Sequence, residues 1–165
     1  MKNTHQLIIE KFTRVADDFQ ALIDQIPEGG MDWSEKEGEW SIRQIIHHLT
    51  DDGIVYIFAI ERALAVTADK YTFGIFPGNN AWADQLKFDQ RPVTPALKLI
   101  DAQRVFLAEM LEHFPDRWDN KIDFYDKDGK QVGSNTIEEM ITMLTEHMQE
   151  HVETIEKILG IHQSD

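Results

Sequence analysis

The sequence predicts an all-α protein that folds as an antiparallel bundle of four helices. Four segments of comparable length each carry apolar residues at intervals of three and four positions, which is the repeat of one buried helical face. Helices of this kind bury their apolar faces most economically against one another. We therefore expect residues 1–165 to form a single domain, with a long crossover between the second and third helices and a short hairpin before the fourth.

The first helix is expected from about Thr4 to Ile26. Its apolar repeat ends where Pro27 is followed by Gly29 and Gly30, two residue types that stop helices. One face of this helix is predicted to be buried. Its members are Ile8, Phe12, Val15, Phe19, Leu22 and Ile26.

The second helix has a well-defined start at Ser41. Ser41 is a good N-cap, and Gln44 three residues later completes a capping box. Trp40 and Ile45 occupy the positions of a hydrophobic staple. Gly53 lies on the apolar face, where it would permit a close contact with another helix. The other members of that face are Ile42, Ile45, Ile46, Leu49, Tyr56, Ile60 and Ala63.

The segment from residue 69 to residue 94 interrupts the helical repeat. It combines turn-forming residues with aromatic ones, among them Phe73, Phe76 and Trp82. A crossover of this composition has two interpretations. Its aromatic side chains either form the rim of a ligand pocket or close the end of the core, and the positions of Phe76 and Trp82 distinguish the two.

A third helix is expected to begin at Thr94, with Thr94 as its N-cap and Pro95 in its first turn, and to end before Pro115. Between residues 116 and 135 the chain is mostly polar. Asp128–Gly129 favours a tight turn within this stretch, which predicts the short hairpin.

The fourth helix begins with another capping box, formed by Thr136 and Glu139, and is expected to end at Gly160. Its apolar residues again recur at helical spacing. They are Ile137, Met140, Ile141, Leu144, Met148, Val152, Ile155 and Leu159.

Composition excludes several classes of function. With 30 acidic and 16 basic residues the formal net charge is −14, which disfavours nucleic acid or an anionic membrane surface as a partner. The chain has no cysteine, so disulfides, thiolate ligands and a cysteine nucleophile are excluded. The N-terminus lacks the pattern of a signal peptide, and no apolar run approaches membrane-spanning length. A soluble cytoplasmic protein is expected.

Three of the seven histidines are placed so that they can share one metal ion. His147 and His151 are just over one helical turn apart and lie about 75° and 35° from the centre of the apolar stripe, so both project inward. On the second helix, His48 lies about 100° from the stripe centre, on a flank that can line a cleft between helices. His47, at about 160°, is predicted to be solvated, and Asp52 lies nearer the core than either.

Three neutral imidazoles from two packed helices hold a divalent ion with positions left open for water or substrate. Zinc or nickel is the expected metal, with iron as an alternative, since imidazole suits all of them. Binding is expected to weaken below about pH 6, as histidines take up protons. Asp52 and Glu150 are the catalytic candidates, for orienting a ligand or transferring a proton. The alternative is that the inward histidines are hydrogen-bonded boundary residues.

The stretch WSIRQIIHHLTD, from Trp40 to Asp51, resembles the second-helix signature of the DinB/YfiT-like bundle family. The resemblance continues at Trp82–Ala83 in the crossover and at residues 147–151, HMQEH, in the last helix. It implies a four-helix bundle with a long crossover between the second and third helices. The resemblance also implies which residues bind the metal of the family. By their positions in the matching motifs they are His48, His147 and His151, the same three histidines that the helical angles favour.

Two departures from the family pattern leave the substrate open. The thiol-transferase branch often has a further histidine soon after the equivalent of Asp51, where this chain has Asp52 and Gly53. Many members have two adjacent histidines in the last helix, where this chain has Glu150 and His151.

The resemblance implies a divalent-metal-binding protein that acts on a small molecule as a thiol-dependent S-transferase or a hydrolase, and that forms a homodimer. Without a cysteine of its own, the chain would need a low-molecular-weight thiol as cosubstrate for thiol chemistry. Two alternatives belong to other classes of protein. One is a non-catalytic metal-binding or stress-response bundle, and the other is a helical interaction module that docks a partner through residues 73–82.

Overall fold

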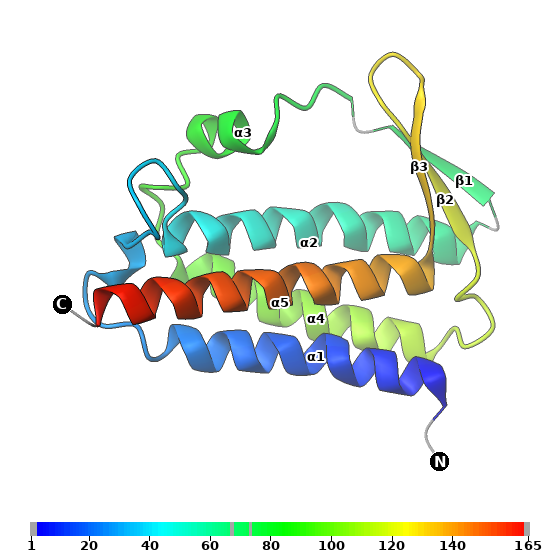
Figure 1. Cartoon of the computed structure of the whole chain (residues 1–165). Coiled ribbons are helices and arrows are strands. Elements are labelled where there is room, and N and C mark those ends of the chain that lie inside the picture. Colours follow the sequence, from blue (N-terminus) through cyan, green and yellow to red (C-terminus); the bar gives the residue numbers. More distant parts are fainter. Residues whose placement is uncertain (1–2, 67, 73, 164–165) are drawn as a thin grey trace.

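Four long helices form the predicted bundle, in which the first and the last run in one direction and the two between them run in the opposite direction (Figure 1). The computed structural model describes residues 3–66, 68–72 and 74–163. The bundle consists of α1 (Thr4–Ile23), α2 (Ile42–Ala65), α4 (Thr94–Glu112) and α5 (Ile137–His162). None of the described helices is both long and apolar enough to cross a membrane.

A small three-stranded sheet is an addition to the expected all-α architecture. The predicted hairpin is present as β2 (Lys121–Tyr125) and β3 (Gln131–Thr136), which pair antiparallel. A further strand, β1 (Ala68–Thr72), pairs in parallel with β2. Strand β1 has no clear alternation of apolar and polar residues, and its partner is some fifty residues away in the sequence. The local sequence pattern therefore does not predict strand β1.

The crossover between α2 and α4 passes over the outer side of α2. It contains β1 and a short helix, α3 (Asn79–Gln85), which stands above α2 in Figure 1, with the hairpin at the other end of the same face. The connection from α1 to α2 holds a turn of 3₁₀ helix, η1 (Gly30–Asp32). The crossover and the hairpin thus stand over one side of the bundle, above α2.

Capping determines where the helices begin. The two predicted capping boxes are present: Ser41 accepts a hydrogen bond from the backbone N–H of Gln44, and Thr136 accepts one from Glu139. Asn3 forms a third box at the start of α1. The prediction that Thr94 is the N-cap of the third helix was wrong. Val93 holds the N-cap position with helical backbone angles, and Thr94 is already the first residue of α4.

The ends of two helices differ from the sequence-based expectation. Helix α1 stops at Ile23, not at Ile26, because the last residues turn tightly through hydrogen bonds such as that from the N–H of Ile26 to the carbonyl of Ile23. Helix α5 continues past Gly160 to His162. The His162 ring stacks on Trp33 at a centroid distance of 4.6 Å, and this tertiary contact favours the longer helix.

Two groups of buried apolar side chains fill the bundle and meet at its middle. The group nearer the sheet includes Phe12, Leu107 and Met140, and the group at the other end includes Phe19 and Ile155. Along α5 the boundary falls between Leu144 of the first group and Met148 of the second. His147 lies at this boundary.

Helix α2 packs closely against α4 at Gly53, where the sequence predicted a close contact between helices. A Cβ atom at Gly53 would lie 2.4 Å from Oε1 of Gln103 on α4, so a larger residue requires the Gln103 side chain to move. Nε2 of Gln103 donates to the carbonyl of Thr50 at 3.4 Å. This contact helps to determine the position of α2 one residue away from Asp52.

Ser41→Ala is expected to lower the free energy of unfolding by about 1 kcal/mol, because it leaves the first N–H groups of α2 without their cap. Urea unfolding followed by circular dichroism measures the change. Ser34→Ala is the matched control: Ser34 is partly exposed outside any helix and donates only to the nearby carbonyl of Lys36, so its removal should cost less than about 0.5 kcal/mol. Equal effects of the two substitutions would contradict the capping role.

Candidate metal centre

Three histidines from α2 and α5 meet side by side. His147 and His151 are one turn apart on α5, and α2 packs against α5 so that His48 faces both. Nε2 of His147 lies 3.3 Å from Nε2 of His48 and 3.1 Å from Nε2 of His151. One ring nitrogen from each of the three lies within 4.8 Å of the others. Helical spacing accounts for the first pair, and tertiary packing brings in the third histidine.

Asp52 determines the tautomer of His147. Its Oδ2 lies 3.1 Å from Nδ1 of His147, and since a carboxylate only accepts hydrogen bonds, Nδ1 must carry the proton. Nε2 of a neutral His147 is then a bare lone pair that points at the other two histidines. Carboxylate–imidazole pairs of this kind orient the ligands of metal sites and increase their basicity.

The spacing of the nitrogens fits a shared cation. Imidazole nitrogens bind zinc at about 2.0–2.1 Å, so two ligands of a tetrahedral ion are separated by about 3.3 Å. Two of the three N–N separations, 3.1 and 3.3 Å, are close to that value, and the third is below 4.8 Å. A single lone pair on His147 can accept only one good hydrogen bond, whereas one cation would satisfy three converging lone pairs. The donor set therefore fits a divalent metal ion that favours imidazole.

Burial favours the neutral forms of His48 and His151. Desolvation lowers the pKa of His48, although the Asp52 carboxylate opposes that change. Desolvation, reinforced by His147 and His48, lowers the pKa of His151 to about 4. Nδ1 of His151 is buried without a hydrogen-bond partner among the described residues, so the surroundings offer no acceptor to a doubly protonated ring. Protons thus compete with a metal ion at lower pH than they would at free imidazoles.

His47 is buried, and the prediction that it is solvated was wrong. Only 3% of the residue is exposed, because the chain that follows α3 covers this side of α2. Nε2 of His47 lies 3.3 Å from the carbonyl of Arg91, and the ring packs against Phe88 at a centroid distance of 5.4 Å. Helical angle alone describes the side of α2 that faces the bundle. It gives no information about the crossover above the opposite side.

The crossover is attached to α2 beside the histidines. Asp51, next in sequence to Asp52, accepts a hydrogen bond of 2.8 Å from Nε1 of Trp82 on α3. Trp82 in turn contacts Phe76 at a centroid distance of 5.9 Å. Both aromatic residues are exposed and line a cleft, so they form a rim and do not close the end of the core. Phe73, also predicted to belong to this group, lies outside the described residues.

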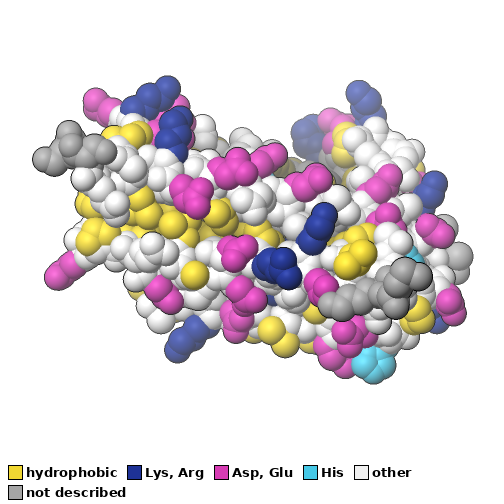
Figure 2. All heavy atoms as spheres, turned by 60° about the horizontal axis from the view of Figure 1, so that its bottom comes forward, with side chains coloured by type: hydrophobic (Ala, Val, Ile, Leu, Met, Phe, Trp, Pro, Cys, Tyr) yellow, Lys and Arg dark blue, Asp and Glu magenta, His cyan; other side chains and the backbone are white. Residues whose placement is uncertain are grey.

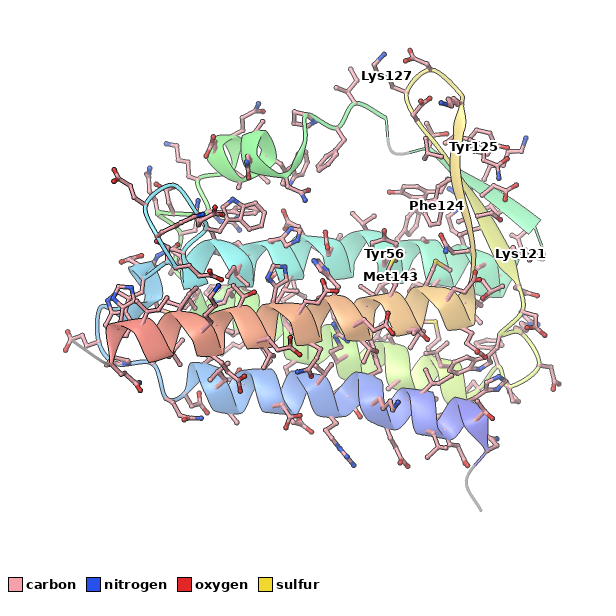
Figure 3. The ribbon with its side chains drawn as sticks, viewed as in Figure 1. Tyr56, Lys121, Phe124, Tyr125, Lys127 and Met143 are labelled. Carbon is pink, nitrogen blue, oxygen red and sulfur yellow. The ribbon has the colours of Figure 1, made fainter. Side chains whose placement is uncertain are left out.

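An open cleft of about 1060 Å³ begins at the histidines and runs between α2, the crossover and the hairpin. His48, Asp52 and His147 form part of its lining. Figure 3 shows Tyr56 on the adjoining part of α2, with Phe124 above it on β2. A separate groove of about 340 Å³ between α1 and α5 includes none of the three histidines.

The two predicted catalytic carboxylates occupy different surroundings. Asp52 lies within the cluster, with Oδ2 also 3.6 Å from Nε2 of His48. Glu150 is exposed beside it and lines a shallow pocket of about 320 Å³, together with Asp52 and His147. Sequence reasoning had placed Tyr56 only in the core, yet it lines this pocket and the larger cleft. Its spacing, one turn beyond Asp52, is the signal that could have identified it.

The comparisons with known proteins agree with this architecture. A family model described as the DinB superfamily matches residues 11–155. A comparison with curated proteins finds no match. Among solved structures, the chain is similar to YfiT from Bacillus subtilis, described as a probable metal-dependent hydrolase with an unusual four-helix bundle topology. The TM-score is 0.80 at 17% identity, over 99% of this chain and 91% of that chain, and a likeness at this identity shows the fold.

The metal-free protein, held in EDTA, is expected to lose stability as the pH falls from about 6.5 to 4. The unfolded chain binds a proton at His151 below pH 6.5, whereas the folded ring binds it only near pH 4, so the free energy of unfolding decreases through that window. His151 alone contributes up to about 3 kcal/mol. Urea unfolding at each pH should show a flatter dependence in His151→Leu.

His113→Gln is the control for this measurement, because His113 is exposed at the end of α4. It should keep the steep dependence of the wild type. A wild type and a His151→Leu variant with the same pH dependence would contradict the burial of a neutral ring at position 151.

Proposed function

The chain belongs to the DinB superfamily, and from that premise we propose that it is a divalent-metal-dependent enzyme with His48, His147 and His151 as the metal ligands. The observation that carries the proposal is the convergence of three imidazole nitrogens within 4.8 Å at the inner end of an open cleft. Three protein ligands and an open side are the arrangement of catalytic metal sites, whereas structural sites are closed by a fourth. Zinc or nickel suits this donor set best, with iron as the alternative.

Each residue of the cluster has a distinct task. His48 and His147 line the cleft directly, so their nitrogens lie next to a bound substrate. His151 does not line the cleft, and its neutral ring offers a lone pair without competition from protons at neutral pH. Asp52 holds the proton of His147 at Nδ1 and thereby keeps Nε2 free. Asp52 is also better placed than Glu150 to accept a proton during a reaction, because it faces the cleft.

The reaction we propose is hydrolysis, or the transfer of an external thiol to a small electrophile. A divalent ion on imidazole ligands lowers the pKa of water to about 7 or holds a thiolate as a nucleophile. Hydrolysis is supported by the likeness to YfiT, described as a probable metal-dependent hydrolase. In either reaction the nucleophile is external to the chain, since no cysteine is available.

His147→Ala is expected to abolish stoichiometric metal binding, because it removes the ligand that contacts both of the others. Elemental analysis of protein purified without a metal-binding tag measures metal per chain. His113→Ala, which removes an exposed histidine, should retain about one ion per chain. Ester hydrolysis and thiol transfer to an electrophile are then assayed on the same samples with and without EDTA. Tight metal binding in His147→Ala, or metal without any turnover, would contradict the proposal.

Asp52→Asn is expected to weaken metal affinity by about 10- to 100-fold, because the amide keeps the hydrogen bond to His147 but removes the negative charge that increases its basicity. Competition with a chromogenic chelator measures the affinity. Glu150→Gln is the matched control, since Glu150 is exposed outside the cluster and should change affinity less than about threefold. Equal losses in the two variants would show that Asp52 acts only through general charge.

A further inference from the structure

The outer side of α2 is apolar where a solvent-facing helix is normally polar. Ile54 and Phe58 are about half exposed on this side, and Val55 lies between them. The crossover and the hairpin stand over the same side (Figure 1), and Ile54 and Val55 line the cleft beneath them. Exposed apolar residues gathered on the solvent side of a helix mark a surface that contacts a ligand or a partner. The second side of α2 therefore points to a ligand or a partner.

Exposed apolar side chains from three parts of the chain converge on this cleft. They come from α2, from the crossover and from the hairpin, and each is between 38% and 83% exposed. Dispersed apolar residues are normal on a protein surface, but a group gathered around one hollow marks a binding site. The group consists of Ile54, Ile75, Phe76, Trp82, Leu86 and Val132.

The size of the cleft selects the kind of ligand. Its volume of about 1060 Å³ lies just above the range typical for sites of small organic ligands, about 300–1000 Å³. A flat surface for a protein partner would not form such a hollow beside His48 and His147. The ligand is therefore a small molecule that is long enough to reach from the histidines toward the hairpin.

The charges around the cleft oppose an anionic ligand. Four carboxylates line it (Asp51, Asp52, Asp126 and Asp128) against two cationic side chains, Arg91 and Lys127. Nζ of Lys127 lies 2.7 Å from both carboxylate oxygens of Asp128, so its charge is already compensated. A divalent ion at the histidines would offset the charges of Asp51 and Asp52 beside it. At the hairpin end, however, Asp126 and Asp128 still outnumber Lys127, and with a formal net charge of −14 for the whole chain this excess favours a neutral or cationic molecule there.

We propose that the substrate is a small neutral or cationic molecule with an extended apolar body, bound along this cleft with its reacting group at the histidines. The inference rests on the proposed metal-dependent activity and adds the substrate class. Phe76 and Trp82 form the apolar wall on the crossover side, and the Asp51–Trp82 hydrogen bond attaches that wall to α2 three residues from His48. Asp51 is thus a positioning residue for the wall.

Three hydroxamates that differ only in their tails test the proposal on zinc-loaded protein. Acetohydroxamate binds the metal alone, octanohydroxamate adds an apolar tail, and suberic acid monohydroxamate ends a tail of the same length in a carboxylate. Isothermal titration measures each Kd, and zinc content is checked after each titration. Octanohydroxamate should bind at least about tenfold more tightly than acetohydroxamate, since each buried methylene strengthens binding about fourfold. The carboxylate tail should lose most of that gain.

Phe76→Ala locates the tail. It should reduce the advantage of octanohydroxamate over acetohydroxamate by about tenfold while leaving the Kd of acetohydroxamate unchanged. Phe106→Ala is the matched control, because Phe106 is exposed to a similar extent (51% against 54% for Phe76) but lies on α4 outside the cleft. The three titrations should give the wild-type values in this control.

The outcomes separate this inference from the proposal on which it rests. If the wild type takes up no zinc, the metal-dependent activity fails and the substrate class fails with it. If zinc is bound but the octanoyl tail adds no affinity, only the apolar cleft is overturned. A carboxylate tail that binds as tightly as the apolar one would overturn the charge argument, and an equal effect of Phe76→Ala and Phe106→Ala would overturn the assignment of the wall.

Discussion

The packing of α2 against α5 is the contact on which the rest of the site depends. His48 and the pair on α5 belong to segments about a hundred residues apart, and only the relative position of the two helices brings them within reach of one ion. Buried apolar residues on either side of the cluster, Leu49 and Met148 at one end and Leu144 toward the other, hold this position. Close-packed interiors change little in shape, so the spacing of the nitrogens is set before any ion binds.

A polar layer crosses the bundle where its two apolar groups meet. The histidines occupy this layer on α2 and α5, and Arg104 occupies it on α4. The Arg104 guanidinium is buried against the ring of Phe12 at 4.1 Å and donates to the carbonyls of Phe12 and Leu144, and desolvation lowers its pKa to about 10. Buried polar groups reduce the stability of a fold unless they are paired. The bundle therefore keeps, at the level of the histidines, a layer that contributes less to stability than apolar side chains would.

The acidic surface and the histidine cluster would act together on the cation that we propose. Acidic side chains outnumber basic ones across the face seen in Figure 2, and the excess acid attracts cations in general. Carboxylates would retain magnesium or calcium, whereas converging imidazoles select a softer transition metal. The charge of the chain thus favours cations and disfavours anions, while three imidazoles in the site that we propose would favour a transition metal over magnesium or calcium.

The amino-acid sequence by itself determined the four-helix bundle and the inward direction of His147 and His151, because both depend on the periodicity of apolar residues. It also determined the capped starts of α2 and α5, because a capping box consists of hydrogen bonds between residues three positions apart. It also favoured His48 over His47 from helical angle. Only the tertiary structure decided that His47 is buried, that Trp82 bonds to Asp51, that β1 joins the hairpin and that an apolar cleft opens at the histidines. Each of these depends on a long crossover folding over the outer side of α2, and contacts between segments so distant in sequence leave no periodic signal in either one.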